Sequence, residues 1–300
     1  MDIFIKAKKP ELDIEYYGQQ SRFFEFFDAV ISDLMKEGGI YAETNSGSNG
    51  NAYMFAKKGY KVITNDISEY SYSVAKAILS DDKPLNIAPK YAWLKEYGDT
   101  YIKRAAVFAS LVDEYGYNSS VPETINEDIK EKISQRIKYF SNMNKNGVRS
   151  YKNYNMDLFQ YLDHLYENKI KVDVLFMDFA WPWRDGKKTE EYETTTNEYL
   201  NVFEESNNNI TEIWDKDTVI DNVLITLEKA KKVSKYVLLS NQSSNYPTPE
   251  ILEINLLVNN FNYIKRHTML VKSEYEDNLG KNEYFREYLY VIKGDLLNEN

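Results

Sequence analysis

The sequence predicts an α/β fold with a largely parallel sheet, and three observations support this. Short apolar runs that are typical of strands alternate along the chain with segments whose apolar residues recur at helical spacing. The run Asp173–Met177 is apolar after its first residue, as expected of a strand that is covered on both faces. The last two runs follow each other without a helical pattern between them, so the sheet should end in an antiparallel pair.

The first 80 residues carry five predicted elements. Apolar side chains such as Phe23, Phe27 and Leu34 recur every three or four positions at the start of the chain, which predicts a helix. Two short apolar runs then predict strands, and a helical segment follows each of them. In chain order these elements are the helix 19–36, the strand 39–42, the helix 50–58, the strand 60–64 and the helix 70–80.

The second half of the chain continues the alternation. Two further apolar runs predict buried strands, each followed by a helical segment. The chain then closes with the two runs that we expect to pair in antiparallel fashion. In order, these elements are the strand 173–177, the helix 218–233, the strand 236–240, the helix 249–260 and the strands 263–271 and 287–292.

Residues 81–150 interrupt the alternation. This segment is mostly helical in pattern, with a turn-like break at 116–122. We therefore predict one domain made of residues 1–80 and 151–300, with residues 81–150 as a helical insertion. Residues 185–217 are polar and rich in Asn, Thr and Glu, which predicts a mobile loop.

The second half of the insertion is basic and aromatic, although the whole chain carries a net charge of −10. A local basic surface can bind phosphates even when the overall charge disfavours nucleic acid. The alternative is a solvated helix face whose charge is balanced by Glu127, Asp128 and Glu131. The basic residues are Lys130, Lys132, Arg136, Lys138, Lys145, Arg149 and Lys152, interleaved with Tyr139, Phe140, Tyr151 and Tyr154.

Composition argues against several kinds of site. The chain has no cysteine, which removes disulfides, thiolate zinc sites and cysteine nucleophiles, and with them methylation at C5 of cytosine. Its two histidines, His164 and His267, lie far apart in the sequence, so no metal site and no Ser-His-Asp triad is expected. Because the chain lacks both a run of 18 apolar residues and the pattern of a signal peptide, we expect a cytoplasmic protein.

A glycine turn followed by an acid is the most informative feature of the chain. The turn Glu43–Gly50 leaves the first predicted strand, and Asp66 follows the second, 19 positions after Gly47. In a doubly wound sheet such a turn lets the backbone approach a ligand, and an acid about 20 residues further on accepts hydrogen bonds from ribose hydroxyls. This spacing favours a nucleoside-containing cofactor over the alternative of an ordinary strand–loop–helix with a surface acid.

The turn favours S-adenosylmethionine (SAM) over NAD. A pyrophosphate cofactor favours the full G-x-G-x-x-G pattern, whereas this turn has only Gly47 and Gly50, with Asn49 in place of a further glycine. Asparagine tolerates the left-handed backbone better than most residues, so the turn can still form. SAM has a ribose and an adenine but no phosphate, so it needs the acid and the turn more than it needs the glycines.

Several short motifs occur in an order that resembles one enzyme family. They are Tyr16–Arg22, the turn Glu43–Gly50, Asn65-Asp66-Ile67, Asn155-Met-Asp157, the strand that ends at Asp178, Ser240-Asn241 and Glu287–Val291. Through them, most of the chain is similar to SAM-dependent DNA adenine-N6 methyltransferases of the Dam-like branch. The resemblance implies a Rossmann-like methyltransferase fold in which the insertion 81–150 recognises the target.

The resemblance also implies roles for individual residues. The N-terminal motif would fold over the methionine part of SAM, the Asn-Asp-Ile motif would reach the ribose, and the Asn-Met-Asp motif would reach the adenine. Some of these residues have plainer explanations: Tyr17 could pack, Glu43 could form an ion pair, and Asp157 could cap a helix. The cofactor-binding residues that the resemblance implies are Tyr17, Gly18, Glu43, Asn45, Gly47, Asp66, Ile67, Asp157 and Asp178.

The catalytic motif is where the chain departs from this family. The family carries Asp-Pro-Pro-aromatic, and this chain has Asp178-Phe-Ala-Trp-Pro-Trp183. Proline fixes φ and thereby the direction of the carbonyl, so Phe179 and Ala180 must achieve that geometry through packing. The resemblance implies that Asp178 accepts a hydrogen bond from the target amine, and that Trp181 or Trp183 stacks on a flipped base.

Three readings of this motif stay open. In the first, the motif is a working variant, and the protein transfers a methyl group from SAM to N6 of adenine in double-stranded DNA, as in restriction–modification or phage protection. In the second, the acceptor is RNA or another amine. In the third, the protein is a catalytically silent methyltransferase-fold subunit or DNA-binding partner, which would need a partner subunit for activity.

Overall fold

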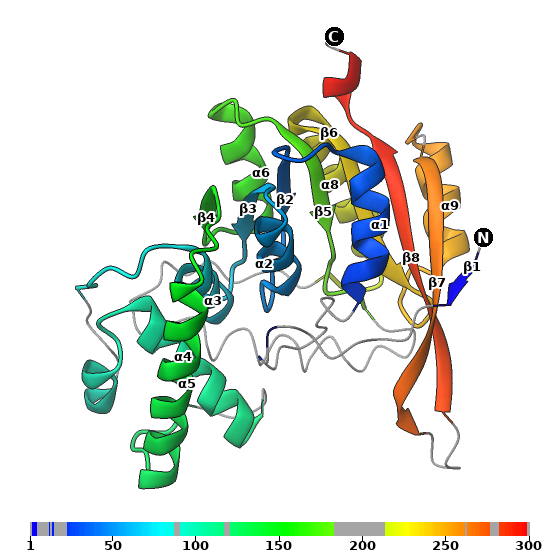
Figure 1. The fold of residues 1–300 in the computed structure, drawn as a ribbon. Helices are drawn as coiled ribbons and strands as arrows, with labels where there is room; N and C mark the ends of the chain where they lie inside the picture. Colours follow the sequence, from blue (N-terminus) through cyan, green and yellow to red (C-terminus); the bar gives the residue numbers. More distant parts are fainter. Residues whose placement is uncertain are drawn as a thin grey trace.

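A twisted mixed sheet of eight strands forms the centre of the molecule in the computed structural model (Figure 1). The structure describes residues 2–4, 12, 14, 23–86, 91–116, 121–182, 214–261, 263–276 and 282–298. The strand order across the sheet is β1-β7-β8-β6-β5-β2-β3-β4. The strands are β1 (Asp2–Phe4), β2 (Ile40–Glu43), β3 (Lys61–Asn65), β4 (Lys152–Tyr154), β5 (Val172–Met177), β6 (Ser234–Gln242), β7 (Tyr263–Glu276) and β8 (Asn282–Lys293).

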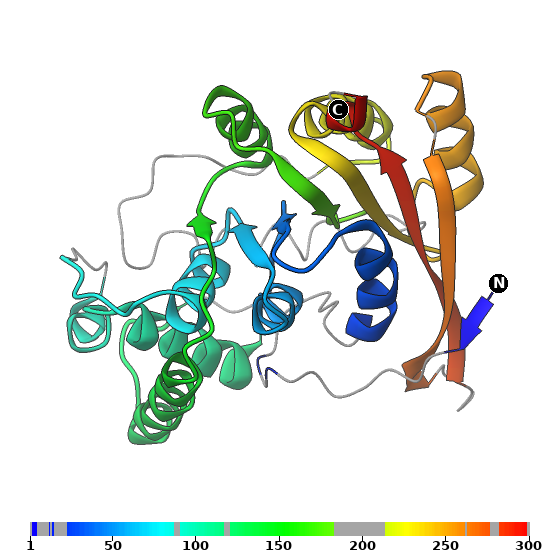
Figure 2. The ribbon, with the colours of Figure 1, turned by 45° about the horizontal axis from the view of Figure 1, so that its top comes forward.

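Helices cover both faces of the sheet, and Figure 2 shows α1 and α2 on one side with α6, α8 and α9 on the other. Short 3-10 helices lie at Ala92–Glu96 and Asp295–Asn298. The α-helices are α1 (Phe24–Leu34), α2 (Gly50–Lys57), α3 (Glu69–Leu79), α4 (Tyr101–Tyr115), α5 (Glu127–Lys145), α6 (Leu158–Glu167), α8 (Val219–Val233) and α9 (Pro249–Val258). The predicted Rossmann-like α/β fold with a helical insertion is therefore confirmed.

The sheet changes winding direction at its centre. Strands β2 and β5 are parallel neighbours, and the chain continues from β2 through β3 to β4 on one side and from β5 to β6 on the other. In open α/β sheets ligands bind outside the carboxyl ends of the strands at such a switch point. Only β8 runs against its neighbours β6 and β7 within the described sheet, as the predicted antiparallel ending requires.

Alternation along the central strands divides the core into two clusters. On β5, Val174 and Phe176 pack into the cluster under α1–α3, whereas Leu175 and Met177 pack into the cluster under α6, α8 and α9. The strand is therefore covered on both faces, as its apolar sequence predicts. Its one polar residue, Asp173, accepts a hydrogen bond from the Ile40 amide at 2.8 Å, which ties β5 to β2.

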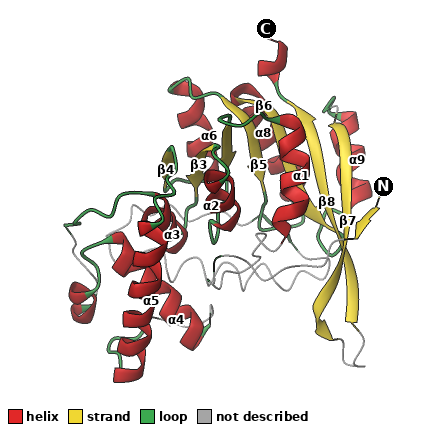
Figure 3. Ribbon diagram, in the orientation of Figure 1, coloured by secondary structure: helices red, strands yellow, loops and turns green. Residues whose placement is uncertain are grey.

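The predicted insertion contains the helices α4 and α5, which stand at one end of the sheet (Figure 3). Both helices pack against α3, and their buried side chains, such as Phe140, join the same cluster as those of α1–α3. An ion pair between Arg104 of α4 and Glu69 of α3, 3.3 Å long, is buried at this junction. The insertion therefore shares its core with the sheet, and its role in target recognition stays a prediction.

Two strands were not predicted. Strand β4 has only three residues, Lys152, Asn153 and Tyr154, and it forms the edge of the sheet beside β3. Strand β1 is also three residues long and pairs with β7 at the opposite edge. The sequence of β4 shows neither alternation nor an apolar block, and the apolar run at β1, residues 3–5, is shorter than the four to eight residues that indicate a strand.

Candidate cofactor and catalytic site

Three carboxylates gather where three neighbouring parallel strands end. Glu43 is the last residue of β2, Asp66 directly follows β3, and Asp178 directly follows β5. These side chains are close enough that the charges of Asp66 and Asp178 each help to raise the pKa of Glu43. The structure thus brings together three of the residues singled out in the sequence, at the switch point of the sheet.

The turn between β2 and α2 has the backbone that its sequence predicts. Gly47 and Asn49 both adopt left-handed conformations, with φ of 50° and 59°. The Asn49 side chain is fully buried, and its Nδ2 donates to the carbonyls of Gly47 at 3.0 Å and Ser71 at 2.9 Å. Asn49 therefore adopts a backbone conformation that usually needs glycine, and its side chain also links the turn to α3.

Three amide donors of this turn are already engaged by the protein itself. The Ser46 amide donates to the Asn65 carbonyl at 2.9 Å, and the Asn49 amide donates to the Ser46 carbonyl at 2.7 Å. The Gly47 amide donates to Oδ2 of Asp66 at 2.8 Å. A phosphate-binding turn keeps such N–H groups free to point at the anion. These three are not free, so the turn is poorly suited to a pyrophosphate.

The turn instead presents hydrogen-bond acceptors. In this turn and at the start of α2, four buried side-chain oxygens have no hydrogen-bond partner among the described residues: Glu43 Oε2, Asn45 Oδ1, Asn49 Oδ1 and Asn51 Oδ1. The side-chain amide of Asn49 is oriented by its Nδ2, which donates to two carbonyls, so its Oδ1 is the atom left without a partner. Buried polar atoms without partners are costly, and they are often completed by a ligand. A ligand that suits this turn would offer hydrogen-bond donors or positive charge.

Glu43 is the most perturbed of the three carboxylates. Only 2% of its surface is exposed, and burial is the main cause that raises its pKa from 4.5 to about 8. Its Oε1 accepts a hydrogen bond from the Tyr41 hydroxyl at 2.8 Å, and this bond and the Ser46 hydroxyl partly offset the effect of burial. At neutral pH the free protein therefore holds Glu43 mainly in its neutral form.

Asp66 is part of the framework of the turn. Its Oδ2 accepts a hydrogen bond from the Gly47 amide, and its Oδ1 accepts one from the Ser68 amide at 2.9 Å. Burial raises the pKa of Asp66, and the hydrogen bonds from Ser68 and Gly47 act in the opposite direction. Asp66 thus joins the glycine turn to the start of α3, and its contact with a ribose stays a prediction.

Two asparagines bring the predicted adenine-contacting motif beside Asp66. The Asn65 amide group exchanges hydrogen bonds with the backbone of Met156, and Asn155 Nδ2 donates to the carbonyls of Asp66 and Ile67 at 2.8 and 2.9 Å. The Oδ1 atom of Asp157 accepts the amides of Phe159 and Gln160, so Asp157 is the N-cap of α6. The capping role is confirmed, and contact with a cofactor stays a prediction.

The described part of the catalytic motif, residues 178–182, forms a tight turn after β5. The Trp181 amide donates to the Phe179 carbonyl at 2.9 Å, and the Pro182 carbonyl accepts the Tyr246 amide at 2.7 Å. The indole Nε1 of Trp181 donates to the Ser240 carbonyl at 3.0 Å, and only 7% of Trp181 is exposed. Asp178 is half-buried beside Glu43, whereas Trp181 is packed into the core.

Three predicted site residues, Tyr17, Gly18 and Trp183, lie outside the described residues. Their predicted roles at the methionine part of SAM and at the flipped base therefore stay predictions. Most of the predicted loop at 185–217 also lies outside them. Residues 214–217 of this loop are described. They include Trp214, which no sequence pattern indicated as a site residue and which is 8% exposed. Trp214 packs 4.6 Å from Phe179 between ring centroids, so the structure adds it to the surroundings of the motif.

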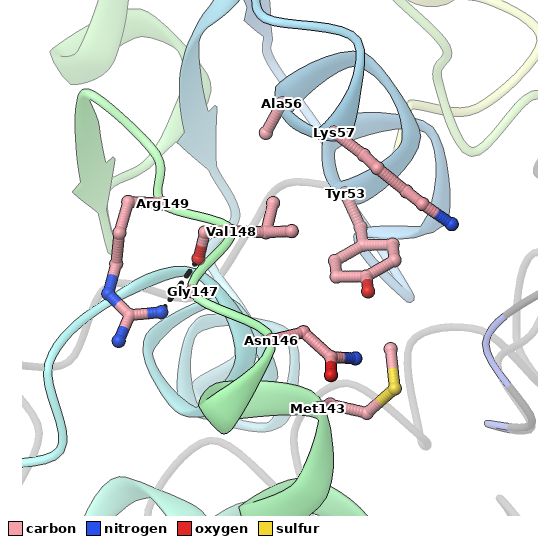
Figure 4. Close-up of a pocket in the computed structure, with 8 residues that line it drawn as sticks. All are labelled: Tyr53, Ala56, Lys57, Met143, Asn146, Gly147, Val148 and Arg149. Atoms are coloured by element: carbon pink, nitrogen blue, oxygen red, sulfur yellow. Dashed lines mark hydrogen bonds between the residues drawn. The ribbon is translucent and has the colours of Figure 1, made fainter.

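A cavity of about 590 Å³ lies at the C-terminal end of α2, as Figure 4 shows. None of the predicted site residues lines it. Arg149, at its rim, donates to the carbonyls of Asn144 and Val148 and pairs with Asp81. The lining residues are Tyr53, Ala56, Lys57, Met143, Asn146, Gly147, Val148 and Arg149. This cavity is therefore separate from the carboxylate edge of the sheet.

Comparison with known proteins gives structural likeness only. No family model and no curated protein matches the chain. A SAM-dependent methyltransferase from Agrobacterium tumefaciens is 7% identical, covers 91% of this chain and 61% of its own, and has a TM-score of 0.43. The magnesium protoporphyrin IX methyltransferase from Synechocystis with bound SAM is 12% identical, with coverages of 91% and 80% and a TM-score of 0.37.

A candidate RNA methyltransferase from Pyrococcus horikoshii is 11% identical, with coverages of 97% and 92% and a TM-score of 0.37. Likenesses as distant as these carry no argument about ligand or activity. The fold assignment rests on the strand order and the winding of the sheet itself. Among the described residues, no helix is long and apolar enough to cross a membrane.

The left-handed backbone at Asn49 predicts an unusual order of stabilities. Asn49→Gly loses the side-chain hydrogen bonds but keeps the conformation, whereas Asn49→Ala loses both. We expect Asn49→Ala to be less stable than Asn49→Gly by about 1 kcal/mol, the cost of a left-handed residue with a Cβ. Urea denaturation of both variants measures the difference.

Asn51 gives the matched control for this comparison. It lies in the first turn of α2, where alanine is favoured over glycine by up to about 1 kcal/mol. The order of stabilities should therefore reverse, with Asn51→Ala more stable than Asn51→Gly. If Asn49→Ala is as stable as Asn49→Gly, the left-handed conformation is not required at this position.

Proposed function

We propose that the protein is a SAM-dependent methyltransferase that modifies the exocyclic N6 of adenine in DNA. The observation that carries the proposal is the edge formed by Glu43, Asp66 and Asp178 at the switch point of the sheet. That edge adjoins a turn whose unpartnered groups are acceptors. The resemblance of the motifs around Asp178 to those of DNA adenine-N6 methyltransferases suggests adenine as the methyl acceptor, although Phe179 and Ala180 replace the prolines of that family.

The chemistry of the turn favours SAM. SAM carries a positive sulfonium and an ammonium group, and it has hydroxyl donors on its ribose, but it has no phosphate. The buried acceptors of Glu43 and Asn45, together with the carboxylate of Asp66, suit a ligand of this kind. A dinucleotide would instead need the backbone N–H groups that Asp66 and the Asn65 carbonyl already occupy.

SAM would supply an electrophilic methyl group to the site. The residues of this chain would then position the acceptor amine. The carboxylate of Asp178 would accept one N–H of the amine and so expose the nitrogen lone pair for in-line attack. In the free protein Glu43 is mainly neutral at neutral pH, so Asp178 has one anionic neighbour fewer until the cationic cofactor binds. The site therefore works chiefly by positioning and electrostatics.

The basic residues of α5 are compatible with DNA binding, but three of them form ion pairs, as the alternative of a charge-balanced helix face predicts. Lys130 pairs with Glu127, Lys132 with Glu114, and Arg136 with Asp113. Ion pairs at a protein surface contribute about 0–1 kcal/mol each, so these cations can exchange their partners for phosphates at little cost. Lys138 and Lys145 are exposed on the same helix.

One observation favours a second candidate, a methyltransferase-fold subunit without activity of its own. Trp181 occupies the position of the stacking aromatic, yet its ring packs against Phe179 and its indole N–H is bound to the Ser240 carbonyl. A ring held in this way cannot stack on a base unless it moves. A silent subunit would still bind SAM or DNA, but it would need a partner chain for transfer.

The test is incubation of the purified protein with labelled SAM and unmodified double-stranded DNA, followed by mass spectrometry of the nucleosides. N6-methyladenine supports the proposal. Calorimetry with SAM distinguishes the remaining outcomes. Binding without transfer, on DNA and on RNA, favours the silent subunit, whereas transfer to RNA alone changes the acceptor. If SAM does not bind, the methyltransferase proposal is wrong.

A further inference from the structure

The backbone that carries Asp178 has few constraints of its own. Neither Phe179 nor Ala180 has a ring that fixes φ. Within residues 178–182, the hydrogen bond from the Trp181 amide to the Phe179 carbonyl closes the turn, and the Tyr246 amide holds its end at Pro182. The packing of the side chains of the turn therefore contributes to the direction of Asp178.

The Phe179 side chain packs in the core below the turn, as the Trp181 side chain does. It is 7% exposed and lies between two indole rings. Trp181 meets it edge-on at 5.2 Å and 72°, and Trp214 lies at 4.6 Å and 55°. Trp181 belongs to the same turn as Phe179, and it ties that turn to β6 through the hydrogen bond from its Nε1 to the Ser240 carbonyl. Trp214 comes from a separate part of the chain, so its contact anchors Phe179 itself.

Trp214 is itself held in place just before α8. The next residue, Asp215, accepts hydrogen bonds on Oδ1 from the amides of Asp217 and Thr218 and from the Thr218 hydroxyl, which fixes the backbone there. The Trp214 ring also lies 6.4 Å from Phe159 in the first turn of α6. Trp214 thus connects Phe179 to two helices that pack on the same face of the sheet.

We infer that Trp214 is a positioning residue for the catalytic motif. By packing on Phe179 it fixes the turn that aims Asp178, a task for which this chain has no proline at positions 179 and 180. The inference rests on the proposed function for its effect on methyl transfer, because the benefit of a fixed carboxylate lies in its alignment with the acceptor amine. Small misalignments in an active site can lower rates by about a hundredfold.

The test compares Trp214→Ala and Trp214→Phe with the wild-type protein. SAM affinity by calorimetry should stay within about threefold in both variants, because Trp214 packs on the catalytic turn rather than on the glycine turn. The value of kcat for DNA methylation should fall at least about tenfold in Trp214→Ala and recover to within about threefold in Trp214→Phe. Deuterium uptake of residues 178–182 should be faster in Trp214→Ala alone.

Phe261→Ala is the matched control. Phe261 is 2% exposed and belongs to the same core cluster, but it is not part of the aromatic group around Phe179. This variant should lose stability while its folded fraction keeps its kcat and its uptake at 178–182. If Trp214→Ala does not fold, Trp214→Leu and Phe179→Leu take its place in both measurements.

The outcomes separate the inference from the proposed function. If wild-type protein does not bind SAM, the proposed function fails, and deuterium uptake alone then decides whether Trp214 holds the turn. A kcat within threefold of wild type in folded Trp214→Ala overturns the inference. An equal loss of kcat in Phe261→Ala also overturns it, and so does unchanged uptake at residues 178–182.

Discussion

Asp178→Asn is expected to remove methyl transfer almost completely while the protein still binds SAM. The change keeps the size of the side chain but replaces one acceptor oxygen by an NH₂ group, which cannot accept a hydrogen bond from the target amine. The loss should be at least about a hundredfold in kcat, the scale of deleting one hydrogen bond that stabilises developing charge. Single-turnover transfer to DNA and calorimetry with SAM measure the two effects separately.

A second readout of the same variant comes from its neighbour. The charge of Asp178 contributes to the raised pKa of Glu43, so Asp178→Asn should lower that pKa somewhat.

Asp163→Asn is the matched control, because Asp163 is an exposed carboxylate on α6 that pairs with Lys229. It should leave both transfer and affinity unchanged. If Asp178→Asn transfers methyl groups within threefold of wild type, Asp178 does not accept from the amine; if SAM binding is lost instead, Asp178 belongs to the cofactor pocket.

The parts of the site that follow local rules could be predicted from the sequence. The left-handed backbone at Gly47 and Asn49 follows from the residue types that tolerate positive φ. The meeting of Glu43, Asp66 and Asp178 at one edge follows from the parallel order of three short apolar runs. The capping role of Asp157 follows from an acid placed directly before a helical segment.

The rest depends on contacts between residues that are distant in the sequence. Trp214 lies at the end of a polar segment that showed no periodicity, and only the fold places it against Phe179. The sequence cannot show that the Gly47 amide donates to Asp66 and is therefore not available to a ligand. The neutral state of Glu43 likewise depends on burial by elements from the whole chain. These features distinguish this site from a generic nucleotide fold.

Glu43→Gln is expected to change the pH dependence of stability more than any other single substitution at this edge. The pKa of Glu43 is about 8 in the folded protein against 4.5 for an ordinary carboxyl. Between these values the folded state holds a proton that the unfolded state has released, so the free energy of unfolding falls as pH rises from about 4.5 to about 8. At about 1.4 kcal/mol per pKa unit, the cost reaches a few kcal/mol at pH 8.

Glutamine removes this titration and keeps an acceptor for the Tyr41 hydroxyl. The variant should therefore be more stable than wild type at pH 8 and nearly equal to it at pH 4.5, as measured by urea denaturation at a series of pH values. Glu228→Gln, at an exposed position on α8, is the control and should keep the wild-type slope. A slope for Glu43→Gln equal to that of wild type would falsify the assignment of a buried, protonated carboxyl.

The same substitution tests why a buried acid is placed in the turn. Glu43 has an oxygen that accepts no hydrogen bond from the described residues, and a cationic ligand beside it would favour its ionised form. Binding of SAM near neutral pH should therefore release protons, which calorimetry in buffers of different ionisation enthalpy detects. Glu43→Gln should bind SAM more weakly and release fewer protons while being the more stable protein. Stability and cofactor binding would then make opposite demands on this one side chain, as is common where a site is built from strained or unpaired groups.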